Sequence, residues 1–325
     1  ILSPDGELNF ISFATLVSAT GQFLGELYFV SYVASGRDLL REEAAATAKR
    51  DLLVWANPDF GAPLNSANAS ELATLRAAEA GAFRDLQFRP LPGSESEAAM
   101  LRQHVTEFRF EKVKAFLGKD ATEEELNHVE SPYVLHLATH GFFLPESESL
   151  HRKNDAGSSN QARRPKYKLV KNPMLRSGLA LAGAQSTMAA WANGKGVGSS
   201  SDGIVTAEEV AGLNLQGTWL VVLSACDTGA GEARAGEGVL GLRRGFVQAG
   251  AQNLLMTLWP IEDGKTAPFL ADFYAAASKS GRPALALAEV QREWLVKLRA
   301  EKGLANACRT AGPFILSFQG NREVW

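Results

Sequence analysis

The chain has 325 residues, a formal net charge of −3 and 46 % hydrophobic residues. That hydrophobic content supports a sizeable core and excludes global disorder, and the small net charge gives no sign of a surface for nucleic acid or membranes. Only two cysteines occur, Cys226 and Cys308, so a disulfide scaffold is excluded and we expect a reducing compartment, the cytoplasm. The sequence has no signal peptide and no apolar run of the ~18 residues that a membrane span needs. Because it begins at Ile1, within what reads as a folded unit, we expect it to be part of a longer protein.

Residues 1–49 are predicted to form a small β-rich segment, ending in a helix, that packs on the core. Asp5-Gly6 is typical of a hairpin turn. Aromatic and β-branched residues at 26–33 predict a strand, and a helix is expected from Gly36 to about Lys49.

Residues 50–325 alternate strands with helices and form the main domain. Strands are predicted at residues 51–56, 112–117, 133–141, 179–181, 219–223, 253–258 and 314–318. Helices are predicted at 69–79, 95–108, 241–249, 265–278 and 283–301, and capping boxes at 122–125 and 206–209 each predict a short helix. This order predicts an α/β fold, a mostly parallel sheet of about six strands with helices on both faces. Two polar stretches, 145–170 and 193–203, are predicted to be flexible insertions.

Two of these strands carry reactive residues where they end. The apolar run Trp219–Leu223 is typical of a buried parallel strand and leads to Cys226, and the strand at 133–141 ends in His140 and Gly141. Open α/β sheets place reactive groups at the carboxyl ends of their strands, so we expect an imidazole and a thiol side by side. A neighbouring imidazole can take the proton of a thiol and make it nucleophilic. The backbone N–H groups of Gly141 and Cys226 are the expected donors to a developing oxyanion.

Two other residues of the same chemical types are interpreted as supporting or incidental. His136 lies four residues before His140, on the same face of its strand, and is interpreted as a packing or supporting residue. Cys308 is expected in a short polar turn without a function.

A glycine motif suggests an alternative interpretation, nucleotide binding. Gly236, Gly238 and Gly241 match G-x-G-x-x-G, with Glu262 and Asp263 about 20 residues later. A dinucleotide fingerprint follows its strand directly, whereas ten residues, 226–235, intervene here. We interpret the glycines as letting a loop fold back over the thiol.

The segments around His140 and Cys226 resemble the CHAT domain, a family of caspase-like cysteine peptidases related to separase and often fused to tetratricopeptide repeats. The resemblance rests on LHLATHGFF at 135–143 and LSACDTG at 223–229. It continues at residues 2–6, 172–184, 202–210, 236–244, 258–263 and 314–317, and so spans nearly the whole chain. It implies a caspase-like fold for residues 50–325, with His140 as the base and Cys226 as the nucleophile.

The resemblance further implies a cysteine endopeptidase that cleaves a protein partner through an acyl-enzyme. No metal or organic cofactor is implied, and gating by attached tetratricopeptide repeats or by a partner protein is expected. The separation of 86 positions from His140 to Cys226 exceeds the ~50 of caspases, and the two insertions can absorb the excess. The sequence around Cys226 departs from the caspase pattern, so specificity for aspartate is not carried over. In separase-like relatives an acidic residue recognises a basic side chain, which makes Asp263 a candidate substrate-binding residue, with Asp227 and Asp202 in reserve.

Two alternatives stay open at this point. Asp263 could instead cap the helix that follows it. The whole domain could be a catalytically silent scaffold that keeps a caspase-like shell for binding. The intact His-Gly and Ala-Cys pairs favour the enzyme.

Overall fold

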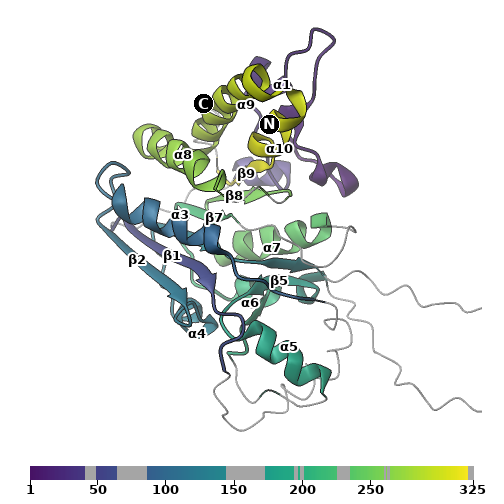
Figure 1. The fold of residues 1–325 in the computed structure, drawn as a ribbon. Coiled ribbons are helices and arrows are strands. Elements are labelled where there is room, and N and C mark those ends of the chain that lie inside the picture. The colour runs from purple at the N-terminus through teal and green to yellow at the C-terminus, as the bar shows by residue number, and fades with distance from the viewer. Residues whose placement is uncertain are drawn as a thin grey trace, which may run out of the picture.

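The computed structural model describes residues 1–40, 49–63, 86–143, 173–193, 197, 201–224, 235–259, 261 and 264–320. Its centre is a six-stranded sheet with helices on both faces, and a second sheet of three strands lies beside it (Figure 1). The insertion predicted at 145–170 lies outside the described residues, as does most of the insertion predicted at 193–203.

The large sheet has the strand order β2-β1-β3-β7-β8-β9. Its first five strands run parallel, and only β9 runs antiparallel to its neighbour β8. The strands are β1 (Asp51–Pro58), β2 (Lys112–Gly118), β3 (Val134–Ala138), β7 (Leu220–Leu223), β8 (Asn253–Thr257) and β9 (Phe314–Phe318). The predicted fold class, an α/β fold with a mostly parallel sheet of six strands, is therefore confirmed.

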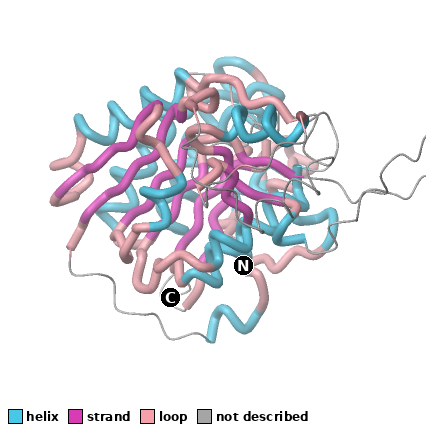
Figure 2. Tube along the Cα trace, turned by 90° about the horizontal axis from the view of Figure 1, so that it is seen from below, coloured by secondary structure: helices cyan, strands magenta, loops and turns pink. Residues whose placement is uncertain are grey.

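Helices cover the two faces of this sheet in separate layers (Figure 2). Val134 and Ala138 face a core formed with α3 (Pro92–Gln103), α8 (Thr266–Ser280), α9 (Pro283–Lys302) and α10 (Leu304–Ala311). Leu135 and Leu137 face the opposite core, formed with α4 (Glu123–Asn127), α6 (Ala207–Ala211) and α7 (Ala235–Ala249). Every residue of β3 is buried, as expected for a central parallel strand with helices on both sides.

The small antiparallel sheet was not predicted as a separate sheet. It consists of β4 (Gly141–Phe143), β5 (Ser177–Ala180) and β6 (Ile204–Thr206), in that order. Only Thr139 and His140 connect β3 of the large sheet to β4 of the small one. A third apolar cluster, with Phe142 and residues of α5 (Ala184–Ala192), lies next to this sheet.

The N-terminal segment, here residues 1–40, is not β-rich, so that part of the prediction is wrong. It contains the 3-10 helices η1 (Gly6–Phe10), η2 (Phe13–Thr15) and η3 (Gly36–Leu40) and the short helix α1 (Leu24–Leu27). Its β contacts are isolated bridges, of which Tyr32 makes one to Ser317 of β9. The backbone of Tyr32 accepts from Phe318 at 3.1 Å and donates to Leu316 at 3.1 Å. Of the run at 26–33 that was predicted as a strand, Glu26 and Leu27 instead belong to α1, and Tyr32 pairs with the edge of β9.

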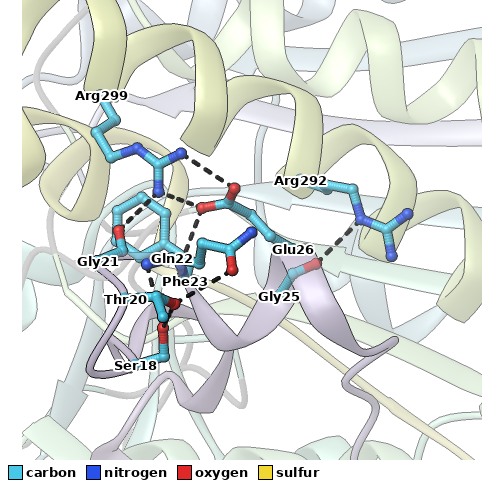
Figure 3. A network of polar contacts seen from close by, with 9 residues as sticks. All are labelled: Ser18, Thr20, Gly21, Gln22, Phe23, Gly25, Glu26, Arg292 and Arg299. Carbon is cyan, nitrogen blue, oxygen red and sulfur yellow. Dashed lines mark hydrogen bonds and ion pairs between the residues drawn. The ribbon is translucent and has the colours of Figure 1, made fainter.

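Polar contacts hold the N-terminal segment on α9 (Figure 3). The Glu26 carboxylate accepts two N–H groups of Arg299, one of them at 3.0 Å, and Arg292 Nε donates to the Gly25 carbonyl at 3.1 Å. Two arginine–aromatic contacts accompany them, because Arg292 lies over the ring of Phe29 and Arg299 over the ring of Phe23.

Cys308 lies in helix α10 and not in a polar turn, which corrects the prediction for that residue. Leu304, Ala307 and Ala311 are spaced at helical intervals. Ala307 and Ala311 are fully buried against the core, so this spacing outweighs the polar residues between them. Burial raises the pKa of the Cys308 thiol.

Candidate functional site

The carboxyl ends of β3 and β7 lie side by side, at one edge of the large sheet. Leu137 pairs with Leu223 in the parallel ladder, and the N–H of Ser224 donates to the carbonyl of Leu137 at 3.2 Å. His140 follows β3 after one intervening residue, whereas Cys226 lies outside the described residues. The described site is therefore the histidine side of the expected dyad, next to the strand that leads to the cysteine.

The ring of His140 is held in one orientation. Its Nε2 lies 2.7 Å from the backbone carbonyl oxygen of Arg89. A carbonyl oxygen only accepts, so Nε2 carries the proton and, in the neutral ring, Nδ1 carries the lone pair. Two aromatic rings flank the imidazole, with centroids 5.1 Å away for Phe60 and 5.8 Å away for Phe88. The side chain is 1 % exposed. The fold thus holds the imidazole of His140 in one orientation, with the lone pair of the neutral ring on Nδ1.

The backbone N–H of Gly141 is not used by the small sheet. Gly141 pairs with Leu179, and the N–H of Ala180 donates to the carbonyl of His140 at 2.9 Å. In an antiparallel ladder this places Gly141 and Leu179 in a non-hydrogen-bonded pair, whose N–H groups point away from each other's strand. Since β4 is an edge strand of this sheet, the Gly141 N–H is directed away from β5. This geometry suits a donor to an oxyanion.

Thr139 fixes the turn between the two sheets and was not singled out from the sequence. Its side chain is fully buried, and its hydroxyl donates to the carbonyl of Ala180. The same residue of β5 therefore binds Thr139 through its carbonyl and His140 through its N–H. A hydroxyl in an otherwise apolar strand end, between Ala138 and His140, is the sequence signal that could have identified it.

His136 belongs to a separate buried network that joins β3 to two helices. Its Nε2 lies 2.9 Å from the Glu97 carboxylate of α3, and its Nδ1 lies 2.9 Å from the Tyr274 hydroxyl of α8. Burial raises the pKa of Tyr274 well above its usual range, and the Glu97 charge raises it further, so the phenol keeps its proton. Both ring nitrogens are engaged by side chains of the core, which agrees with the interpretation of His136 as a supporting residue.

The acidic candidates for substrate recognition are described only in part. Asp263 and Asp227 lie outside the described residues. Asp202 is 2 % exposed, and its Oδ1 accepts the N–H of Ile204 at 2.9 Å. A carboxylate that binds the backbone two residues ahead is typical of a turn, and here it precedes β6.

The three glycines of the alternative nucleotide-binding motif lie inside helix α7, so the interpretation of these glycines as part of a loop is wrong. Apolar residues at 239, 242, 246 and 249 recur at helical spacing across them, which outweighs the cost of about 1 kcal/mol for each glycine in a helix. A dinucleotide fingerprint needs its glycines in the turn between strand and helix. This arrangement does not fit one.

The described part of the chain offers neither a metal-binding cluster nor a membrane-spanning helix. None of its His, Cys, Asp and Glu side chains gather in groups of three or more that could hold a metal ion. None of its helices combines the length and the apolar character that crossing a membrane requires.

Comparison with known proteins agrees with the resemblance seen in the sequence. The family model of the CHAT domain matches residues 1–311. The chain is also similar to the mouse protein "Tetratricopeptide repeat protein 28", with 24 % identity over 307 residues. The match covers 90 % of this chain but only 11 % of that protein, so the chain spans a small part of its relative.

Proposed function

Because the chain belongs to the CHAT domain family, we propose that it is a cysteine endopeptidase with Cys226 as the nucleophile and His140 as the general base. The observation that carries the proposal is the orientation of His140. Its Nε2–H donates to the Arg89 carbonyl, which puts the lone pair of the neutral ring on Nδ1, the atom that would take the thiol proton. The imidazole lies at the end of the strand that pairs with β7, from which the chain runs on to Cys226.

Chain connectivity supports the pairing of these two residues. Leu137 and Leu223 are opposite each other, and His140 and Cys226 are each the third residue after that pair. Two residues of chain reach at most about 7 Å, and this limit on the distance from Ser224 supports a Cys226 within reach of this edge of the sheet. An encounter between the thiol and the imidazole therefore needs no large movement of the described framework.

The chemistry follows from these roles. His140 Nδ1 takes the proton of the Cys226 thiol, and the thiolate attacks the scissile carbonyl carbon. The N–H groups of Gly141 and Cys226 donate to the oxyanion of the tetrahedral intermediate. The imidazolium then gives its proton to the leaving amine, which leaves an acyl-enzyme on Cys226. Water, deprotonated by His140, hydrolyses the thioester and restores the thiol. The Arg89 carbonyl accepts the Nε2–H throughout and stabilises the imidazolium.

The substrate and its control are further parts of the proposal. We propose a protein substrate with a basic residue before the cut, recognised by Asp263 or Asp227. Asp202 is the weakest of the three candidates, because it is buried and bonded to backbone. Gating by tetratricopeptide repeats, in the same or a partner chain, is proposed from the name of the mouse relative. Activity of the thiol requires a reducing compartment such as the cytoplasm.

Labelling with an iodoacetamide probe, read out by peptide mapping, tests the proposal. The two cysteines of the chain provide an internal control, since burial raises the pKa of the Cys308 thiol and slows its alkylation. We expect fast labelling of Cys226 in the wild type and in Cys308→Ala, and at least tenfold slower labelling in His140→Gln. In a peptide-library digest, the wild type and Cys308→Ala should cleave and Cys226→Ala should not. If Cys226 is labelled at the same rate in the wild type and in His140→Gln, and the wild type cleaves no peptide, the domain is a silent scaffold instead.

A further inference from the structure

A short strap of chain, residues 86–91, supports the ring of His140 from outside its own strand. The strap connects to the N-terminus of α3 and has no regular secondary structure. Its Arg89 carbonyl accepts the Nε2–H, and its Phe88 ring forms one wall beside the imidazole. The position of the strap therefore decides both the tautomer and the orientation of His140.

Asn57 holds the end of the strap that leads into α3. Its Oδ1 accepts the N–H of Leu91 at 2.8 Å, and its Nδ2 donates to the Glu95 carboxylate at 2.8 Å. The N–H of Asn57 donates to the Ser94 hydroxyl at 2.8 Å, which in turn donates to the carbonyl of Leu91 at 2.7 Å. Asn57 thus fixes the N–H of Leu91 directly and its carbonyl through Ser94, at a position two residues after Arg89.

The backbone at Asn57 is itself shaped for this contact. Its φ of 43° is in the left-handed region, which asparagine tolerates better than most residues. The register between β1 and β2 shifts between Ala56 and Pro58. Such irregularities near the end of a strand often re-aim a side chain. Here the re-aimed side chain is the one that holds the strap.

Gln185 holds the strap at a second point, Phe88. The side-chain Oε1 of Gln185 accepts the N–H of Phe88 at 2.9 Å, and the backbone N–H of Gln185 donates to the carbonyl of Phe60 at 2.8 Å. Phe60 is the second wall of the imidazole. One residue of α5 therefore connects both aromatic walls of His140.

We propose that Asn57 and Gln185 are positioning residues for the base of the peptidase, which they orient through the Arg89 carbonyl without touching the substrate. The inference rests on the proposed function in that His140 is the base. When the clamp is lost, the strap moves, the Nε2–H loses its acceptor, and the ring can take the other tautomer or turn. A misplacement of about 1 Å in a catalytic group can cost about 100-fold in rate. We expect kcat to fall by about 10- to 100-fold with KM nearly unchanged.

Four variants separate the effect of the two side chains from that of the backbone. Asn57→Gly removes the amide but keeps the positive φ, which glycine adopts without strain. Asn57→Asp combined with Glu95→Gln exchanges carboxylate and amide, and should restore the bond between them and the acceptor for Leu91. Gln185→Leu removes the acceptor for Phe88, whereas Gln185→Glu keeps it. The matched control is Ser131→Gly, which also removes a polar side chain from a residue with positive φ, here 44°. Ser131 lies before the start of β3, at the amino ends of the parallel strands and therefore away from His140.

The decisive measurement is the tautomer of His140, by long-range ¹H–¹⁵N spectra of protein labelled at its five histidines and assigned with His140→Gln. The wild type, Ser131→Gly, Gln185→Glu and the exchanged pair should show a proton on Nε2. Asn57→Gly and Gln185→Leu should show a mixture of tautomers, with unfolding curves that confirm a folded chain. Wild-type ring signals in both of these variants would overturn the inference, whatever their activity. If the ring signals change as expected but the wild type cleaves nothing, the clamp stands and the proposed function fails.

Discussion

Replacing Glu26 by glutamine should measure how strongly the N-terminal segment is held to α9 (Figure 3). The carboxylate accepts two N–H groups of Arg299 and the N–H of Phe23 at 2.8 Å. The Glu26 side chain is 12 % exposed and that of Arg299 is 27 % exposed, so the pair is partly shielded from water. Exposed pairs contribute up to about 1 kcal/mol, and breaking a buried pair costs about 3–5 kcal/mol. We expect Glu26→Gln to lower the free energy of unfolding by about 2 kcal/mol at neutral pH.

The pH dependence of this effect has a definite sign. Burial alone would raise the pKa of Glu26, but the hydrogen bonds from Arg299 and Phe23 and the charges of Arg299 and Arg292 outweigh it and lower the pKa below the ordinary 4.5. As the pH falls, the unfolded chain therefore binds this proton before the folded chain does. The stabilisation by the pair is present in full above the ordinary pKa and is lost as the pH falls through the folded pKa.

Urea unfolding, followed by the fluorescence of the six tryptophans, measures this difference at pH 7, 5, 4 and 3. The gap between wild type and Glu26→Gln should be about 2 kcal/mol at pH 7 and should narrow as the pH falls below the ordinary pKa of 4.5. Glu125→Gln is the control, because Glu125 pairs with Lys114 at 3.6 Å with both side chains about half exposed. A gap that stays constant down to pH 3, or one no larger than that of Glu125→Gln, would refute the reasoning.

Three further predictions concern the core. Glu97→Ala should destabilise the protein by about 3 kcal/mol in urea unfolding, because it leaves the buried Nε2 of His136 without its acceptor. A loss below about 1 kcal/mol would show that water replaces the carboxylate. Gly178→Ala should cost about 1–3 kcal/mol in the same assay, since its Cβ would lie 2.3 Å from a carbonyl oxygen of β6; an unchanged midpoint would contradict this. Burial raises the pKa of Tyr32 to about 12, so stability should fall as the pH rises from 10.0 to about 12, and Tyr32→Phe should remove that part of the fall.

The inner strands of the large sheet could be predicted because they are largely apolar runs followed by turn residues. β7 and β9 are buried at every position and need no contact information to be recognised. The N-terminal segment could not be predicted in the same way. Its aromatic residues predict a strand, but the backbone partners of Tyr32 lie in β9, far along the chain, and a local sequence pattern cannot indicate such a distant partner. Strands of three residues, such as β4 and β6, are too short to show any periodicity.

The candidate site likewise contains residues that the sequence identifies and residues that it does not. His140 and Gly141 were identified because their side-chain types and their place after a strand indicate chemistry. The partner of His140 is a backbone carbonyl, and a carbonyl is present at every residue, so nothing in the sequence distinguishes Arg89. Asn57 begins the sequence Asn57-Pro58-Asp59, which predicts only the end of a strand. Its role depends on a φ of 43° and on a strap some 30 residues further along.

The two histidines of β3 show why a neutral partner suits the proposed base. His136 has the carboxylate partner that a serine protease gives to its histidine, but its other nitrogen is taken by Tyr274 and nothing remains for a nucleophile. The Nε2–H of His140 donates to a neutral backbone carbonyl, which fixes the tautomer of the neutral ring. A thiol with an ordinary pKa near 8.5 needs far less help to ionise than a hydroxyl does. For a cysteine nucleophile, orienting the ring is therefore the larger task, and the strap and its two amide clamps are suited to it.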